Sequence, residues 1–492
     1  MTSTGSASRA IRPRSTARRR RLVATAGLLL LLLLGAVAAL VVLGQIGASP
    51  RLLAPYIERR SSGHNPLIEA AGQRIAAALL RVDRGRLEPR RDYPAWSLPP
   101  TVATPTPAGR ELTLTEAGQL QHELARAQPG DVLTLAPGRY RFGGRSLAVR
   151  RPGRADAPIT VRAPQPGSVL LEFDLLEGFH VSAPYWVFEN LTIVGVCRAD
   201  DDCEHAFHVV GAAQHVQIRH NEIRDFNAHL KVNGADGAFP DHGRLIGNRL
   251  VNTRPRRTAN PVTPFDLVAA SDWRVEANLI ADFVKDGGDF TSYGAFAKGG
   301  GAGNQFVRNV VLCEHRLRGA AGRRVGLSFG GGGSGAAACR DRRCVLEHER
   351  GLMRDNLIVS CSDDGIYVNR SAQSEIIHNT LIDTAGIDIR FAESTARVEG
   401  NLVDGPIRVR DGAILRDSDN RDTPLWARYI GLPGVRGYFA DALGLDLRWV
   451  SAPPRRSQAQ APFDLCGLPR PAAPAYGAFE TLDRCAQRSG AR

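Results

Sequence analysis

Along most of this chain, apolar and polar residues alternate in short runs that are typical of β-strands. In runs such as PITVRA (158–163), SVLLEF (168–173) and YWVFENLTIVG (185–195), apolar side chains recur at about every second position, the period of a strand with one buried face. Before them, TEAGQLQHELARAQPGDVLTLAPGRY (115–140) predicts a helix capped by Thr115, followed by a turn and a short strand. No long helical pattern returns before the C-terminal region, so the pattern indicates a fold made of strands.

The strands carry an internal repeat, an asparagine closely followed by an aliphatic residue. Successive copies are 31, 27, 30, 31, 47, 23 and 22 residues apart, and strands that recur at such steps are typical of a solenoid. We therefore predict an all-β, right-handed parallel β-helix over 111–480, with the helix after Thr115 capping its open end. We expect the asparagines to adopt the left-handed turn conformation and to hydrogen-bond to one another along the axis. They are Asn190, Asn221, Asn248, Asn278, Asn309, Asn356, Asn379 and Asn401.

The repeat leaves one alternative fold open and contains one insertion. A β-sandwich or a propeller with coincidental asparagine spacing is the alternative fold. The 47-residue step marks an insertion that contains FGGGGSGAAACRDRRC (329–344), and insertions in solenoids are often binding regions.

The N-terminal region predicts a membrane anchor. Leu22–Leu43 contains 22 residues without a charge, enough to cross a hydrocarbon layer of about 30 Å. Seven arginines precede it within the first 21 residues, so the positive-inside rule places the N-terminus in the cytoplasm and the rest outside. A cleaved signal peptide is the alternative, because AVA at 36–38 resembles a cleavage site.

From these features we predict five segments. They are a basic cytoplasmic tail (1–21), an inner-membrane signal-anchor (22–43), a spacer (44–110), the β-helix domain in the periplasm or extracellular space (111–480) and a C-terminal tail (481–492). Within the spacer we expect an amphipathic helix over 65–82 and an extended Pro/Thr-rich linker over 94–110.

Cysteine content and charge agree with export. The eight cysteines show no zinc-finger spacing, and the pairs Cys197–Cys203 and Cys466–Cys485 predict short-loop disulfides in an oxidising compartment. The net charge is +13, and without the seven N-terminal arginines 13 − 7 = +6 remains. That charge suits an acidic polymer as a partner. No basic stripe interleaves with aromatic residues, so we predict no nucleic-acid partner.

Lysine is scarce and clustered. Of 63 basic residues only three are lysines, Lys231, Lys285 and Lys298, within a window of 68 residues. A lysine can lose its proton when its site lowers its pKa, whereas an arginine keeps its proton in proteins. A lysine in this window is therefore a candidate general base, with chance placement as the alternative.

The segment LQHELARAQPGDVLTLAPGRYR with the following PITVRA resembles the cap and first coil of polysaccharide lyase family 6, the chondroitinase-B-like and alginate-lyase-like β-helix proteins. DLCGLPRPAAPAYGAFE (464–480) resembles the closing segment of exported bacterial β-helix proteins. The resemblance implies β-elimination on an acidic, uronate-containing polysaccharide, with a lysine base. AFAKGGGAGNQFVRNVV (295–311) matches the setting of that lysine, so the resemblance assigns this role to Lys298.

Two departures from the family pattern bear on the site. Ser328 and Phe329 stand where the resemblance predicts an Arg-His pair; Arg323 and Arg324 are near in sequence, and we include Arg324 as a candidate replacement. Metal-binding members carry carboxylates a few residues before the lysine, and 290–297 contains none. The resemblance alone suggests calcium, so we predict no metal ligand and no cofactor.

Other polar residues complete the candidate set. The i, i+2 spacing of His229 and Lys231 places both on one strand face, and CSDDGIYVNR (361–370) follows the insertion. If that face is exposed, the residues that line one groove across consecutive coils are Lys231, Lys298, Asp363 and Arg370; otherwise each is an ordinary surface residue. The catalytic candidates are Lys298, Lys231, His229 and Arg324, and the substrate-binding candidates are Arg370, Asp363, Asp364 and His208.

Two alternative functions remain open. A β-helix that has lost catalysis would be a carbohydrate-binding or envelope-structural protein, which the missing Arg-His pair favours. Asp363 and Asp364 would instead indicate a glycoside hydrolase, because such enzymes use paired carboxyl groups.

Overall fold

A computed structural model describes residues 15–45, 48–99, 109–331, 334–458 and 461–488. The chain divides into two units, Met1–Ser49 and Pro50–Arg492. The first contains helix α1 (Ser15–Gln45), which includes the predicted anchor. Within the residues that the structure describes, none of the helices combines the length and apolar character needed to cross a bilayer.

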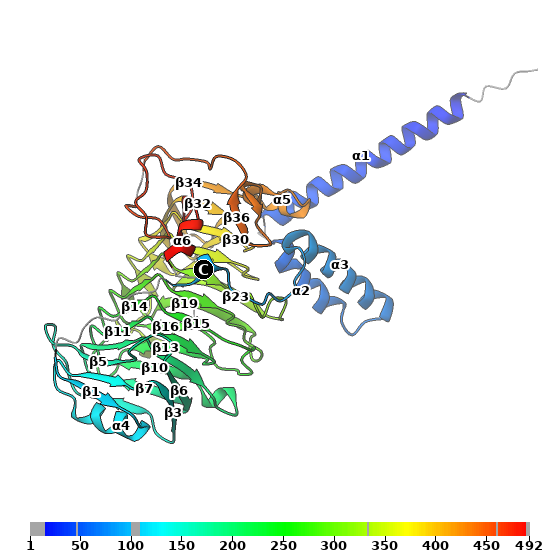
Figure 1. Cartoon of the computed structure of the whole chain (residues 1–492). Helices are drawn as coiled ribbons and strands as arrows, with labels where there is room; N and C mark the ends of the chain where they lie inside the picture. The colour runs from blue at the N-terminus through cyan, green and yellow to red at the C-terminus, as the bar shows by residue number, and fades with distance from the viewer. Residues whose placement is uncertain (1–14, 46–47, 100–108, 332–333, 459–460, 489–492) are drawn as a thin grey trace, which may run out of the picture. The chain divides into compact units, whose positions relative to one another are not determined.

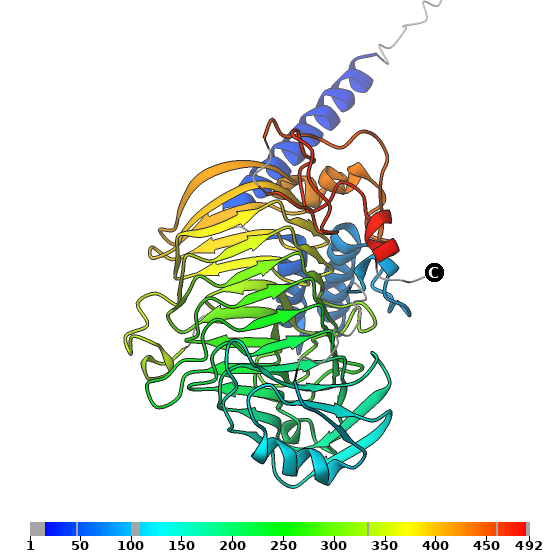
Figure 2. The same ribbon diagram turned by 60° about the vertical axis from the view of Figure 1, so that its left-hand side comes forward.

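The second unit is built around a parallel β-helix, as predicted. Its coils stack one on another from helix α4 (Ala117–Arg126) at one end to strand β34 (Ile414–Asp422) at the other (Figures 1 and 2). Coils contribute strands to three ladders in which all pairings are parallel. Two of these ladders merge through β32 (Thr395–Val403) and β34.

The strand bounds are as follows. The first ladder contains β1 (Glu111–Leu114), β2 (Val132–Leu135), β5 (Ile159–Arg162), β8 (Trp186–Glu189), β11 (Gln217–Arg219), β14 (Arg244–Ile246), β17 (Arg274–Glu276), β21 (Gln305–Val307), β25 (Leu352–Arg354), β29 (Ser374–Ile377) and β32. The second contains β3 (Gly138–Gly143), β6 (Val169–Asp174), β9 (Thr192–Gly195), β12 (Glu222–Arg224), β15 (Arg249–Val251), β18 (Leu279–Ala281), β22 (Val310–Leu312), β26 (Leu357–Val359) and β30 (Thr380–Ile382).

The third ladder, the ten-stranded sheet, carries the candidate lysines. It contains β4 (Leu147–Val149), β7 (Glu177–Val181), β10 (His205–Val210), β13 (Ala228–Asn233), β16 (Phe265–Val268), β19 (Thr291–Lys298), β23 (Arg323–Phe329), β27 (Ile366–Asn369), β31 (Ile387–Arg390) and β33 (Ile407–Arg410). Smaller sheets comprise β20 (Gly301–Ala302), β24 (His348–Glu349) and β28 (Ser371–Ala372), and the antiparallel pair β35 (Phe439–Asp441) and β36 (Asp446–Trp449).

Strand alternation separates the core from the outward face of the ten-stranded sheet. Leu230 and Val232 of β13 are fully buried in the core, whereas Lys231 between them is partly exposed. Parallel register stacks like positions on successive coils, so the Phe179 and Phe207 rings stack inside at 5.1 Å. Outside, His180, His208, Lys231 and Asp266 form one row across four strands.

The asparagines form the predicted ladder along the axis, with one exception. Each ladder side chain donates through Nδ2 to the Oδ1 of the next, for example Asn278 to Asn309 at 2.9 Å and Asn309 to Asn356 at 3.0 Å. Each Oδ1 also accepts the backbone N–H of the preceding asparagine, so these buried amides are paired with one another. The ladder contains Asn221, Asn248, Asn278, Asn309, Asn356, Asn379, Asn401 and Asn420.

The predicted turn conformation was wrong for most of these asparagines. The left-handed residue is the one before the asparagine, such as His220 (φ 57°) or Arg308 (φ 56°). Asn190 itself is left-handed (φ 62°), and Leu191 holds the ladder position, because its N–H donates to Asn221 Oδ1. The ladder thus begins one coil later than predicted and extends to Asn420.

Helices cover one end and one flank of the β-helix. Helix α4 caps the end as predicted, but its cap residue is Glu116, which forms a capping box with Gln119. Helices α2 (Pro50–Ser61) and α3 (Pro66–Arg84) pack on each other, and α3 matches the predicted amphipathic helix. Two short helices lie near the C-terminus, α5 (Leu425–Tyr429) and α6 (Asp483–Arg488). The predicted linker falls largely on 100–108, outside the described residues.

A buried ionic cluster, the flank network, joins α2 and α3 to the β-helix. Asp383 accepts from Arg51 (3.1 Å), Arg84 (3.1 Å) and Arg318 (2.8 Å), and all four side chains are at most 3% exposed. The network consists of Arg51, Asp83, Arg84, Glu314, Arg318, Asp383, Asp404 and Arg428.

Four disulfides are present. Cys197–Cys203 and Cys466–Cys485 confirm the two predicted pairs, and Cys313–Cys361 and Cys339–Cys344 complete the set. Such a set indicates an oxidising compartment outside the cytoplasm.

Candidate functional site

A groove of about 740 Å³ lies on the outward face of the ten-stranded sheet. Two of the three lysines, Lys231 and Lys298, line it, so the structure brings together the two sequence-predicted lysines. Its opposite wall comes from 334–342, which belongs to the predicted insertion. The full lining is Lys231, Asn233, Gly234, Ala235, Asp236, Gly237, Phe239, Val268, Lys298, Ser334, Gly335, Ala337, Ala338, Cys339, Arg340 and Arg342.

Lys298 is the last residue of β19, where burial shifts its protonation equilibrium toward the neutral amine and a ring contact favours the ammonium ion. Its Nζ lies 4.3 Å from the centre of the Phe296 ring, and Gly331 packs near the same two side chains. Burial lowers the pKa of Lys298 below its ordinary 10.5, since a charged group is poorly solvated there. The charge of Lys231 lowers this pKa further, whereas Asp266 and Glu347 oppose the shift.

Lys231 lies two strands away, on β13, and forms an ion pair. Its Nζ is 2.9 Å from Asp266 Oδ2, and the Asp266 side chain is only 4% exposed. A buried carboxylate requires a partner charge, and Lys231 supplies it to Asp266. Of the two groove lysines, Lys231 thus carries an ion pair and Lys298 is the one whose pKa is lowered.

The insertion wall is held in place by specific contacts. The Arg340 N–H donates to Gly299 O (2.9 Å), directly after Lys298. The Arg340 guanidinium donates to both oxygens of Asp241 (2.8 and 2.9 Å) and lies 4.3 Å from the Phe239 ring centre. Cys339–Cys344 closes the loop. Arg342 lines the groove and is exposed, which leaves its guanidinium open to a ligand.

The carboxylates near Lys298 do not fit a calcium ion, which the family resemblance would suggest. Asp266 is paired with Lys231 and Asp241 with Arg340. Glu347 is buried and accepts the Gly299 N–H at 3.0 Å. Among the described residues, no three carboxylates converge here as ligands for an ion.

Two predicted catalytic residues lie outside the groove. His229 is fully buried, its Nε2 contacts Val251 O at 3.2 Å, and burial lowers its pKa to about 3. Arg324 is 2% exposed and pairs with Glu314 at 3.0 Å. Both side chains serve internal contacts, so neither meets a substrate in this groove.

Three predicted substrate-binding residues also lie elsewhere. Asp363 and Asp364 precede β27 at the opposite end of the strands, where burial raises the pKa of both; Asp364 Oδ1 is 2.5 Å from Arg408. Arg370 lies over the Phe391 ring at 5.2 Å and does not line the groove. The expected grouping of Asp363 and Arg370 with the lysines was wrong.

His208 lies beside the groove. Its Nε2 is 2.7 Å from Oδ1 of Asn233, a lining residue, and its Nδ1 is 2.7 Å from Glu177 Oε1. The residues that sequence reasoning missed are Asp266, Asn233 and Arg342. Asn233 lies two positions after Lys231, so the i, i+2 spacing that groups His229 with Lys231 could also have identified it. Asp266 could be identified only from the strand register, which places it beside Lys231.

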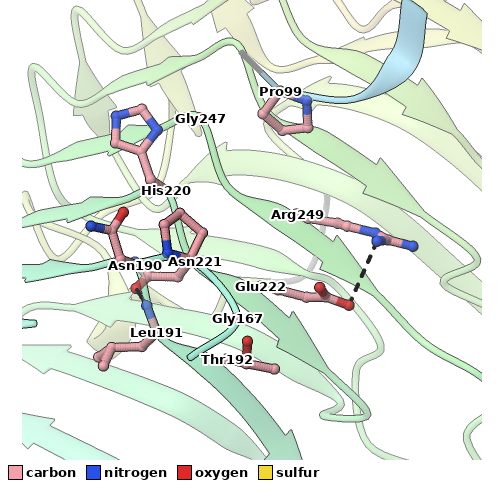
Figure 3. Close-up of a pocket in the computed structure, with 11 residues that line it drawn as sticks. Pro99, Gly167, Asn190, Leu191, Thr192, His220, Asn221, Glu222, Gly247 and Arg249 are labelled. Carbon is pink, nitrogen blue, oxygen red and sulfur yellow. Dashed lines mark hydrogen bonds and ion pairs between the residues drawn. The ribbon is translucent and has the colours of Figure 1, made fainter. Parts of the chain in front are cut away.

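A smaller hollow of about 160 Å³ lies by the asparagine turns (Figure 3). Its one charged pair is Arg249–Glu222, at 3.7 Å. The lining consists of Pro99, Pro166, Gly167, Asn190, Leu191, Thr192, His220, Asn221, Glu222, Gly247 and Arg249. None of these lining residues is a lysine, and we assign the hollow no catalytic role.

Comparison with known proteins supports the resemblance predicted from the sequence. No protein-family profile matches the chain. It is 25% identical over 224 residues to pectate lyase L of Dickeya dadantii (strain 3937), covering 39% of this chain and 52% of that protein. The chain therefore spans about half the length of the curated relatives it matches.

A solved pectate lyase structure agrees on the fold. The crystal structure of pectate lyase Pel9A matches with a TM-score of 0.50 and 14% identity, covering 76% of this chain and 97% of that chain. A family 6 polysaccharide lyase of Pseudopedobacter saltans has a TM-score of 0.33 at 13% identity, covering 63% and 92%. The chain thus resembles polysaccharide lyases of the parallel β-helix fold.

Proposed function

We propose that this protein is an exported polysaccharide lyase that cleaves a uronate-containing polymer by β-elimination, with Lys298 as the base. The observation that carries the proposal is the placement of Lys298 and Lys231 in one groove on the β-helix. The resemblance to pectate lyase L favours pectate as the first polymer to test.

Carboxylate neutralisation and proton removal each have candidate residues. The proton next to the substrate carboxylate becomes acidic only when that carboxylate is neutralised, a role for the cations of Lys231 and Arg342 at the groove surface. Lys298 Nζ takes the proton, a carbon–carbon double bond forms, and the glycosidic oxygen leaves and is protonated by water. The lowered pKa of Lys298 increases the share of neutral amine available for this step.

The test is a polymer panel. Full-length protein is incubated with pectate, alginate and chondroitin, and the ultraviolet absorbance of the unsaturated product is followed alongside the release of reducing ends. We expect absorbance with one polymer, and a loss of about a thousandfold in Lys298→Ala. Reducing ends without absorbance would indicate hydrolysis, and binding alone would indicate a carbohydrate-binding protein; either outcome contradicts the proposal.

The membrane anchor over 22–43 is a separate proposal. We expect the chain to sediment with membranes and to resist extraction at alkaline pH. N-terminal sequencing of the exported protein distinguishes this from a cleaved signal peptide, because cleavage after 36–38 would release a soluble chain that starts beyond that point.

A further inference from the structure

Three side chains that are typical metal ligands converge on the outward face of the ten-stranded sheet. Glu177 and His180 lie on β7 and His208 on the next strand, β10. Their ligand atoms all lie within 4.8 Å of one another. Glu177 Oε2 is 3.0 Å from His180 Nδ1, and Oε1 is 2.7 Å from His208 Nδ1.

The hydrogen bonds of His208 leave room for either a proton on the ring or a metal ion at this point. Asn233 donates through Nδ2 to Gly234 O (3.0 Å), which turns its Oδ1 toward His208 Nε2 at 2.7 Å. Oδ1 only accepts, so Nε2 carries the hydrogen. A neutral His208 then directs the Nδ1 lone pair at Glu177 Oε1, which is also an acceptor. Two acceptors at 2.7 Å need a proton or a metal ion between them.

The donor set favours a metal ion of a particular class. Two imidazole nitrogens and one carboxylate are the ligands of three-residue zinc sites, and calcium prefers oxygen alone. The side chains are 34% (His180), 17% (His208) and 23% (Glu177) exposed, which leaves a path for an ion to enter. The hydrogen bond from His208 to Asn233 fixes the ring, as outer-shell partners of metal-bound histidines do.

We propose that Glu177, His180 and His208 bind a divalent transition metal of the zinc class, with at least one coordination position open. Asn233 also lines the groove, so the ion lies beside it, in the row that continues to Lys231. Three to four strand spacings separate the ion from Lys298, roughly 17 Å at the usual spacing. The ion is thus distinct from the base, and its binding is testable without lyase activity.

The experiment measures metal binding directly. The full-length protein carries an affinity tag without histidine, and a chelator first removes bound metal. It is then titrated with Co²⁺, with binding measured by visible absorbance, and separately with Zn²⁺, with binding measured by calorimetry. We expect one ion per chain and a loss of affinity of at least tenfold in His208→Ala and Glu177→Gln. His215→Ala is the matched control, because His215 stacks between Tyr185 and His242 outside this cluster.

Folding of each variant is checked by circular dichroism. If His208→Ala fails to fold, His180→Gln removes a ligand from the more exposed ring and serves in its place. The proposal is overturned if wild-type protein binds neither ion more tightly than these variants, or if His215→Ala weakens binding as much. A proton between Glu177 and His208 would then explain the contacts, and the lyase proposal would be unaffected.

Discussion

The flank network and the groove differ in which basic residue they contain and in how far it is buried. In the flank network, Arg51, Arg84 and Arg318 are almost fully buried around Asp383. In the groove, Lys231 and Lys298 are partly exposed, and one of them has its pKa lowered. Arginine has several fixed donors and keeps its charge, so it suits a buried junction, whereas lysine can release a proton. The third lysine, Lys285, is paired with Asp289 at 2.7 Å.

The largest effect is expected when Lys298 in the groove is replaced by arginine. Lys298→Arg keeps the positive charge and the contact with Phe296, but the side chain can no longer accept a proton. We expect kcat/KM for elimination to fall about a thousandfold, as for a missing general base. The assay is product absorbance at saturating and limiting polymer.

Lys285→Arg is the matched control for that change, since Lys285 does not line the groove. Its activity should equal that of the wild type. Unchanged elimination in Lys298→Arg would show that Lys298 supplies only charge, and the base would have to be sought elsewhere.

The reverse exchange tests the flank network. Arg84 donates from Nε to Asp383 (3.1 Å) and from Nη2 to Glu314, two carboxylates that one ammonium group cannot both reach in this geometry. Arg84→Lys should lower the free energy of unfolding by about 2 kcal/mol, the order of one or two lost charge-assisted hydrogen bonds. Urea denaturation measures it, with activity per folded molecule unchanged.

An exposed pair provides the comparison for Arg84. Arg448 binds Asp446, but its side chain is 72% exposed, so Arg448→Lys should leave the unfolding midpoint where it is. If Arg84→Lys and Arg448→Lys lowered the free energy of unfolding equally, burial of the flank network would add nothing to the stabilisation by its ion pairs.

A smaller effect is expected at the second lysine. Lys231→Met removes one cation that we assign to the substrate carboxylate and leaves Asp266 without its partner. We expect kcat/KM to fall about tenfold, less than for a donor in an enclosed site because the groove is open. Polymer binding, measured by calorimetry, should weaken in parallel; full activity would remove Lys231 from the substrate-binding set.

Much of the fold was predictable because stacking repeats itself in the sequence. Asn221 to Asn401 have an aliphatic residue two positions later, and their side chains form the ladder. For Asn190 the next aliphatic in the pattern, Ile193, lies three positions later, and Asn190 is the one that falls outside the ladder. The misplaced residue therefore had a visible signature in the spacing.

The site was only partly predictable, since strand alternation says which residues point outward and not what covers them. His229 shares the alternation of Lys231 but lies under other groups, with Arg256 close enough to influence its pKa. Asp364 is held by Arg408 from two strands later, at 2.5 Å. These contacts come from loops and register that the spacing of residues does not encode.

The smallest expected effect is a shift in the pH dependence of kcat/KM, which tests how the charges of Lys231 and Asp266 act on the pKa of Lys298. The neutral form of Lys298 grows as pH rises through its pKa, so kcat/KM should rise with pH, with the midpoint of the rise below 10.5. The Lys231 charge lowers this pKa and the Asp266 charge raises it. Lys231→Met should therefore move the rise to higher pH and Asp266→Asn to lower pH. Shifts in the same direction for both variants, or a rate that falls with pH, would contradict Lys298 as the titrating base.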